Sequence, residues 1–309
     1  MNKEQLKQSI RELANQKNAV IFAHYYTRPE IQEIADFIGD SLALAQQATR
    51  VQADILVMCG VHFMGETMKI LCPDKKVLIP DMKAGCSLAD SCDPKELAQF
   101  KEAHPDYTIV SYVNTSADVK ALTDIVVTSS NAKNIIDQLP ANEKILFGPD
   151  QNLGSYINSV TGRNMELWNG ACHVHSRFSV KALVKLKKQN PGVPVLAHPE
   201  CKQQILVLSD VIGSTKYLLN YVISSPEKRF IVATESGILF EMQRACPNKE
   251  FIPLQAENIE NSCNECEYMR MNTLENVYAC LRDEQPEMYV EKETAEKAVS
   301  SIRKMLEMS

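Results

Sequence analysis

Residues 19–45, AVIFAHYYTRPEIQEIADFIGDSLALA, decide the fold of this chain. The stretch contains an apolar strand (19–23), a short helix that begins at Pro29, a second strand (36–38) and a helix from Ser41. Strands that alternate with helices are typical of parallel sheets with helical crossovers. We therefore predict that this stretch is the first half of a unit rich in βαβ connections.

The segments on either side complete this unit. A polar helix (4–15) precedes the stretch, and the strand DILVMCG, a helix near residues 63–71 and the strand KVLIP follow it. A loop that carries Cys86 closes the unit. The predicted order is thus four strands, with helices before and between them.

The same order of elements returns twice along the chain, from Pro94 and from Val180. An aspartate opens each second strand at spacings of 88 and 86 residues, and a hydroxyl residue lies five positions after each aspartate. The aspartates are Asp36, Asp124 and Asp210, and the hydroxyl residues are Ser41, Ser129 and Thr215. Repeats of one period indicate three copies of one structural unit.

We predict an α/β fold of three pseudo-threefold-related repeats around a central cavity, each repeat a parallel sheet with helices on both faces. The expected boundaries are 1–90, 91–176 and 177–270, followed by a C-terminal helical segment, 271–309. No low-complexity linker separates the repeats, so we expect them to pack tightly.

Composition excludes several classes of function. The chain has 309 residues and a net charge of -6, which argues against nucleic acid as the main partner. Its apolar runs are shorter than the roughly 18 residues that a membrane span needs, and the polar start MNKEQLKQSIREL is unlike a signal peptide. We therefore expect no membrane partner and a cytoplasmic location, where ten cysteines would stay reduced rather than form a disulfide framework.

Polar side chains follow the predicted strands where ligands bind in open parallel sheets, beyond the carboxyl ends. Those after the first strands are His24, Tyr26, Tyr112, Asn114, His198 and Glu200, and those after the second strands are Ser41, Ser129, Ser214 and Thr215. A hydroxyl before a helix often serves only as an N-cap, and a lone histidine usually satisfies a local hydrogen bond. Their recurrence in three units favours a functional role, which we do not extend to His62, His104 or His173.

Cysteines follow the fourth predicted strand of each unit, namely Cys86, Cys172 and the pair Cys263 and Cys266. Three thiolates that meet on one axis suit a metal centre with one open position. Spacing alone does not separate zinc from an iron–sulfur cluster, and Cys263 and Cys266 could both bind zinc or form a reducible disulfide. The other six, which lie in apolar patterns or at loop edges, are expected to be core or incidental: Cys59, Cys72, Cys92, Cys201, Cys246 and Cys280.

Nearly the whole chain resembles the A-type quinolinate synthase family. The matching stretches are AHYYTRPEIQEIAD, GDSLALA, GVHFMGET, YVNTSADVKALTD, TSSNA, GPDQNLG, HPEC, GST and CEYMRMNTLEN. The resemblance implies three similar α/β units around a cavity and one [4Fe-4S] cluster, with ligands that fall on Cys86, Cys172 and Cys266. It leaves Cys263 as an accessory thiol.

The resemblance also implies the reaction and the roles of site residues. The family condenses iminoaspartate (iminosuccinate) with dihydroxyacetone phosphate to quinolinate, with loss of phosphate and water, and quinolinate is the pyridine precursor of NAD. Substrate contacts fall on His24, Ser41, Tyr112, Asn114, Ser129, His198, Glu200, Ser214 and Thr215. The expected catalytic residues are Glu200, Tyr26, His24 and Tyr112. A functional link to an L-aspartate oxidase or an aspartate dehydrogenase, as the source of iminoaspartate, follows from the same resemblance.

Two other classes of protein compete with this interpretation. A non-enzymatic iron–sulfur or zinc protein would surround its metal with thiols and would not need the His, Tyr and Glu residues at the strand ends. An iron–sulfur hydro-lyase of the aconitase type would also use an open iron. Turnover of iminoaspartate with dihydroxyacetone phosphate separates all three classes.

Overall fold

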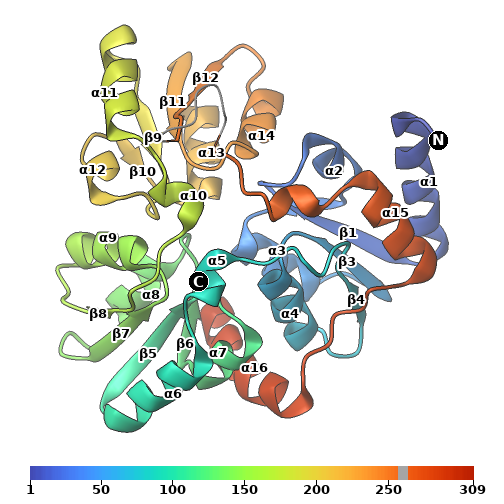
Figure 1. The fold of residues 1–309 in the computed structure, drawn as a ribbon, viewed down its shortest axis with the longest axis horizontal. Coiled ribbons are helices and arrows are strands. Elements are labelled where there is room, and N and C mark those ends of the chain that lie inside the picture. The colour runs from blue at the N-terminus through green and yellow to red at the C-terminus, as the bar shows by residue number, and fades with distance from the viewer. Residues whose placement is uncertain (257–263) are drawn as a thin grey trace.

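Three four-stranded sheets, all parallel, form the framework of the chain (Figure 1). The computed structural model describes residues 1–256 and 264–309. The first sheet has the order β2-β1-β3-β4, with strands β1 (Ala19–His24), β2 (Phe37–Gly39), β3 (Ile55–Cys59) and β4 (Lys76–Leu78). The second has the order β6-β5-β7-β8, with β5 (Tyr107–Tyr112), β6 (Ile125–Val127), β7 (Lys144–Gly148) and β8 (Glu166–Leu167). The third has the order β10-β9-β11-β12, with β9 (Val195–Ala197), β10 (Val211–Ile212), β11 (Arg229–Ala233) and β12 (Glu250–Pro253).

Helices cover both faces of each sheet, as the buried apolar clusters show. Around the first sheet lie α1 (Lys3–Gln16), α2 (Pro29–Ile34) and α15 (Leu274–Asp283) on one face, and α3 (Ser41–Ala48) and α4 (His62–Leu71) on the other. Around the second lie α6 (Pro94–Ala103) and α7 (Ala117–Leu122), opposite α8 (Ala132–Gln138) and α9 (Gln151–Thr161). Around the third lie α11 (Val180–Gln189) and α12 (Gln203–Leu206), opposite α13 (Thr215–Ser224) and α14 (Ile238–Ala245).

The three units share one strand order and surround a common centre in Figure 1. This arrangement confirms the predicted α/β fold of three repeats. Three shorter elements follow the fourth strands along the chain: α5 (Ser87–Asp90), α10 (His173–Ser176) and the 3₁₀ helix η1 (Met269–Met271). Each of the three comes just after one of the predicted ligand cysteines.

The repeated aspartates make the same bonds in all three units. Asp36, Asp124 and Asp210 each accept, at 2.8 Å, the backbone N–H of a residue in the neighbouring first strand. Each aspartate also forms an ion pair with a basic side chain on the helix before that strand. The same basic side chain donates a hydrogen bond to the backbone carbonyl two residues before the aspartate. These cations are Arg11, Lys101 and Lys187. The second strands therefore begin one residue after the aspartate, because its carboxylate stands in for a ladder carbonyl.

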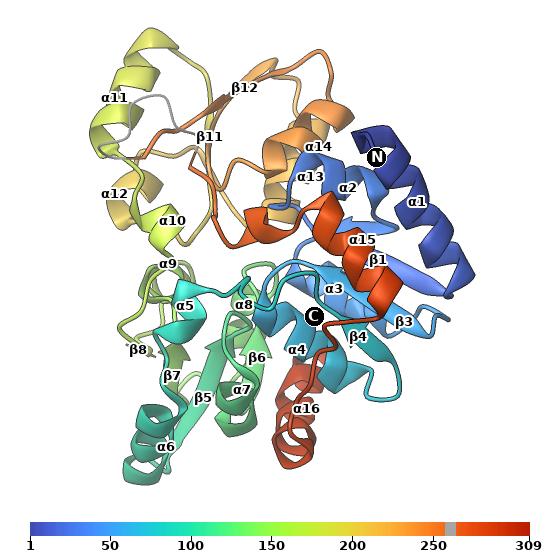
Figure 2. The same cartoon turned by 45° about the vertical axis from the view of Figure 1, so that its right-hand side comes forward.

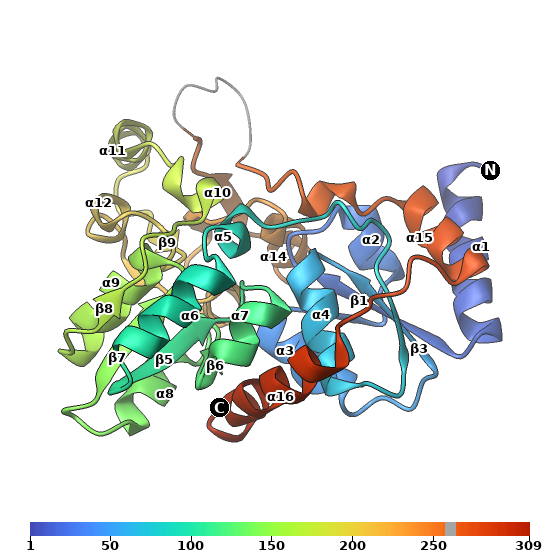
Figure 3. The same cartoon turned by 60° about the horizontal axis from the view of Figure 1, so that its bottom comes forward.

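The last helices return to the first two units. In the second view of the fold, α15 runs beside α1, and the two helices pack together (Figure 2). The final helix, α16 (Lys292–Glu307), packs on α7, β6 and α4 (Figure 3). Its Ala298, Ile302 and Met305 belong to a buried apolar cluster that is continuous across both units. Burial of this helix face thus joins the first unit to the second.

Two local features differ from the sequence prediction. The strand expected at MELW is only two residues long, Glu166–Leu167. Helix α8 begins at Ala132, so Ser129 lies in a turn before the helix rather than at its N-terminus. In the described part of the chain, the helices fall short of the length and apolarity that crossing a bilayer demands.

Candidate active site

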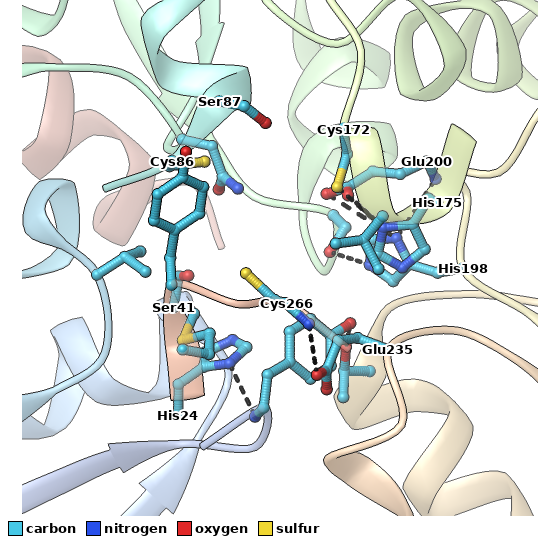
Figure 4. A pocket seen from close by; sticks show the side chains of 18 of the residues that line it. His24, Ser41, Cys86, Ser87, Cys172, His175, His198, Glu200, Glu235 and Cys266 are labelled. Atoms are coloured by element: carbon cyan, nitrogen blue, oxygen red, sulfur yellow. Dashed lines mark hydrogen bonds and ion pairs between the residues drawn. The ribbon is translucent and has the colours of Figure 1, made fainter. Parts of the chain in front are cut away.

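A cavity of about 80 Å³ lies where the carboxyl ends of the strands converge. All three units contribute side chains to its wall, and Figure 4 shows them directed inward from separate elements. Of the predicted site residues, twelve line the cavity: His24, Tyr26, Ser41, Cys86, Tyr112, Asn114, Ser129, Cys172, His198, Glu200, Thr215 and Cys266. The repeat thus brings together residues that lie more than 200 positions apart in the sequence.

Three cysteine thiols face the same space from three units (Figure 4). Cys86 precedes α5 and Cys172 precedes α10, each as the N-cap residue, and Cys266 lies three residues before η1. Burial raises the pKa of Cys86 to about 12 and that of Cys266 to about 11, and it raises the pKa of Cys172 well above its usual value. Thiols this buried stay protonated until a bound cation draws off the proton.

Two buried carboxylates hold the cysteine loops in place. Asp150 accepts the backbone N–H of Cys172 at 3.0 Å, and Glu235 accepts that of Cys266 at the same distance. Each acid lies two residues beyond the third strand of its unit, and burial raises the pKa of each to about 7. Val61 occupies the equivalent position in the first unit, where no carboxylate can serve.

Glu200 lies at the centre of a buried polar cluster. Its carboxylate accepts the Tyr112 hydroxyl at 2.6 Å and pairs with Nδ1 of His175 at 2.8 Å. Burial by itself would raise the pKa of Glu200, but the pairing with His175 and the hydrogen bond from Tyr112 lower it below its usual value. Glu200 is therefore an ionised base at neutral pH rather than an acid.

A second set of metal donors overlaps this cluster. Cys172, His175 and Glu200 each present one donor atom, and these atoms lie within 4.8 Å of one another. Such a compact trio suits a single ion, but its closeness is also explained by the His175–Glu200 ion pair. The three cysteines are more widely spread, as expected where each thiolate binds a different iron of one cluster.

The two histidines near the ends of first strands, His24 and His198, are uncharged. Burial lowers the pKa of His24 to about 4 and that of His198 to about 3. Nδ1 of His24 accepts the backbone N–H of Tyr26 at 3.1 Å, and Nδ1 of His198 accepts that of Glu200 at 3.3 Å. Nε2 of His198 also faces the Ser129 hydroxyl of the second unit at 3.2 Å. Each ring thus uses one nitrogen for a local bond, which sets its orientation in the cavity.

The Tyr26 hydroxyl joins the first unit to the third. It lies 2.7 Å from the Thr215 hydroxyl and 2.9 Å from that of Thr234. Burial, followed by the charge of Glu200, raises the pKa of Tyr26 well above 10. Tyr26 is thus a neutral hydroxyl that can donate a hydrogen bond or a proton at physiological pH.

The actual helix caps leave two hydroxyls free for other roles. Helix α3 is capped by Asp40, which accepts the N–H of Ala43, and α13 is capped by Ser214, which accepts the N–H of Tyr217. Ser41 and Thr215 are therefore not N-caps, and both line the cavity. Ser214 lies outside the central cavity, in a separate groove, so the structure does not bring this predicted substrate contact to the site.

Several lining residues escaped the sequence prediction. They are Asp40, Ser87, His173, His175 and Glu235. Glu235 carries a detectable signal, since it matches Asp150 in its position after a third strand. His175 shows none, because its partner Glu200 comes from another unit. The predicted accessory thiol, Cys263, lies outside the described residues, and the six cysteines expected to be core or incidental are all buried.

The described wall of the cavity contains neither lysine nor arginine. The donors that an anion would meet here are hydroxyls, the Asn114 amide and backbone N–H groups at the starts of α3 and α13. The carboxylates of Asp40, Glu200 and Glu235 face the same space. The site therefore suits an anion whose charge is also met by a bound metal.

Comparison with known proteins gives one consistent result. The model of the family described as Quinolinate synthetase A protein matches residues 8–307. The quinolinate synthase of Microcystis aeruginosa is 54% identical over 301 residues, which cover 97% of this chain and 94% of that protein. Those of Synechocystis sp. and Chloroherpeton thalassium are 52% and 50% identical, over 97% and 98% of this chain and 94% of each relative. The chain therefore belongs to the quinolinate synthetase A protein family and is an enzyme.

Proposed function

We propose that this enzyme condenses iminoaspartate with dihydroxyacetone phosphate to form quinolinate, with release of phosphate and water, in the de novo synthesis of NAD. The observation that carries the proposal is the convergence of Cys86, Cys172 and Cys266 on the cavity that also holds Glu200. Relatives named quinolinate synthase are 50 to 54% identical to this protein over nearly the whole chain.

The donor set fits a [4Fe-4S] cluster on Cys86, Cys172 and Cys266. Three soft thiolate donors reach one space from three sides, and iron–sulfur clusters are held by such thiolates. When bound, a cluster with three protein ligands keeps one iron open as a Lewis acid for a substrate oxygen or nitrogen. The cavity wall supplies the remaining contacts.

Substrate anions would be held mainly by neutral donors. Ser41, Ser129 and Thr215 line the cavity, and Ser41 and Thr215 begin helices whose first N–H groups lack intrahelical partners. The Asn114 amide adds a further donor. We assign these groups to the carboxylates and the phosphate of the two substrates.

Proton transfer falls to residues whose charge states differ. Glu200 is ionised and accepts a proton during the loss of water and the tautomerisation that a pyridine ring requires. Tyr26 and Tyr112 keep their protons, because burial raises the pKa of each well above 10, and they serve as donors. His24 is neutral and orients substrate by hydrogen bonding.

We further propose that the enzyme works in the cytosol, where its ten cysteines would stay reduced and able to bind iron. Iminoaspartate must then come from the oxidation of aspartate. This requirement supports a functional link to an L-aspartate oxidase or an aspartate dehydrogenase.

The proposal is tested by turnover on anaerobic protein. Purified enzyme is analysed for iron and sulfide, then given iminoaspartate generated in place and dihydroxyacetone phosphate, and quinolinate is measured by chromatography. We expect quinolinate only from protein that holds a cluster, with the Cys172→Ser variant as the inactive control. A cluster-loaded enzyme that forms no quinolinate would contradict the proposed substrates.

A further inference from the structure

The residue that follows each ligand cysteine takes part in one hydrogen-bonded chain. Ser87 Oγ lies 2.5 Å from Nδ1 of His173, and Nε2 of His173 lies 3.0 Å from Oε2 of Glu267. These residues come directly after Cys86, Cys172 and Cys266. We call Ser87, His173 and Glu267 the clasp, since they connect the cysteine loops of all three units.

The chemistry of the clasp is self-consistent. A proton on Nε2 of His173 is donated to the Glu267 carboxylate, which leaves the Nδ1 lone pair to accept the Ser87 hydroxyl. The ring of Tyr268 packs edge-on against His173, with 6.1 Å between ring centroids, and limits its rotation. The His173 side chain is 20% exposed and that of Glu267 is 53% exposed, so the clasp lies at the edge of the cavity.

The three cysteine loops are not equally supported by the rest of the protein. Asp150 and Glu235 hold the backbone N–H groups of Cys172 and Cys266, whereas Val61 stands at the equivalent place in the first unit. The bond from Ser87 to His173 ties the Cys86 loop to a loop that a carboxylate already anchors.

We propose that Ser87, His173 and Glu267 are positioning residues that hold the three cysteine loops at the separation a metal cluster requires. The inference rests on the proposed function for the identity of the cluster, but the loop geometry is open to measurement in the cluster-free chain. None of the three side chains needs to bind iron for this role.

The first experiment measures alkylation of the cluster-free full chain by iodoacetamide, with each cysteine followed by mass spectrometry. His173→Ala removes both bonds and Ser87→Ala removes one. Both variants lose the bond that ties the Cys86 loop, so we expect Cys86 to react roughly two- to tenfold faster in each, the factor that corresponds to a typical net hydrogen bond. Cys59, buried in the core of the first unit, reports global unfolding and should react at the wild-type rate.

A matched control removes a different hydroxyl between units. Ser130 donates to Asp40 at 2.6 Å and so joins the first and second units away from the clasp. Ser130→Ala should leave alkylation of Cys86 unchanged. His173→Gln, which keeps one donor and one acceptor, should restore part of the protection lost in His173→Ala.

The second experiment uses cluster-loaded protein and follows iron release to a chelator under anaerobic conditions. Loss of partners around metal ligands typically weakens metal binding 10- to 100-fold, and we expect release from His173→Ala to quicken accordingly. Wild-type rates of both alkylation and iron release in His173→Ala and Ser87→Ala would overturn the clasp. A wild-type chain that takes up no cluster would refute the proposed function instead, and alkylation would still decide on the clasp.

Discussion

Replacing Glu200 by glutamine separates its chemistry from its structural role. Glu200 is 3% exposed, and its carboxylate accepts bonds from Tyr112 at 2.6 Å and His175 at 2.8 Å. Glutamine has the same size and keeps one oxygen for the Tyr112 hydroxyl. Its NH₂ group can donate to Nδ1 of a neutral His175, so the Glu200→Gln variant should fold and keep its cavity.

The expected loss is larger than a binding effect. Removal of a general base costs about 10²- to 10⁴-fold in rate, or about 2.7 to 5.5 kcal/mol in the activation barrier at 1.36 kcal/mol per tenfold. Loss of one hydrogen bond to a charged group costs about 1.5 to 3 kcal/mol, and it appears in KM when substrate and transition state are bound equally. A fall in kcat at saturating substrate therefore identifies Glu200 as the base.

The assay measures quinolinate formation and cluster absorption on the same anaerobic sample. Glu235→Gln is a matched control, because Glu235 is a buried glutamate that lines the same cavity. Its two oxygens accept N–H groups from Cys266 and Gly237, so either orientation of an amide would set NH₂ against a backbone N–H. We expect Glu235→Gln to lose cluster, whereas Glu200→Gln keeps cluster and loses turnover.

Two results would refute this reasoning about Glu200. Near-normal kcat in Glu200→Gln would remove the residue from the mechanism. Loss of iron from Glu200→Gln would instead favour the compact donor set of Cys172, His175 and Glu200 as the metal site. Rates of iron release from both variants, compared with the wild type, decide between these outcomes.

Three further predictions concern other parts of the molecule. Ser214→Ala should lower the free energy of unfolding by about 1 kcal/mol in urea, through loss of the α13 cap, and should leave KM unchanged. Thr215→Ala should raise KM. If Ser214→Ala raised KM and Thr215→Ala did not, Ser214 would be the substrate contact. Glu284, paired with Lys17 and Lys76, has its pKa lowered to about 2, so the stability it adds is present above pH 4.5 and lost as the pH falls toward 2; Glu284→Gln should therefore unfold more easily at pH 6 and show little difference at pH 2, and equal pH curves would contradict the pairing. Serine in place of any one of the proposed ligands Cys86, Cys172 and Cys266 should abolish the cluster absorption, whereas Cys263→Ser should keep it. The opposite result would show that the proposed ligand set is wrong.

The repeat was predictable because its aspartates have a structural function. Asp36, Asp124 and Asp210 each close the same bond between a second strand and a first strand, so their spacing reports the period of the fold. The cysteines at the ends of the fourth strands follow from that period. A side chain whose role is repeated in every unit can be found by counting.

Residues whose partners lie in another unit could not be found in that way. His175 has its role from Glu200, which is in the third unit, and the approach of the two depends on how whole units pack. Ser214 and Thr215 are neighbours in sequence, yet one caps a helix and the other lines the cavity. Only the exact start of α13 separates these two roles, and helix starts are the least certain part of a sequence prediction.

The repeated fold also explains why the chemistry of the site is not symmetric. Tyr26, Asn114 and Glu200 follow the first strands of the three units at the spacings of 88 and 86 residues that the aspartates share. Identical backbone units therefore aim a neutral hydroxyl, an amide and an ionised carboxylate at one cavity. In the proposed reaction Glu200 would accept a proton from the substrate, and the Tyr26 hydroxyl would donate one at a different atom. The proposed ring formation with loss of water needs both a proton acceptor and a proton donor, and the diverged copies of one unit provide them.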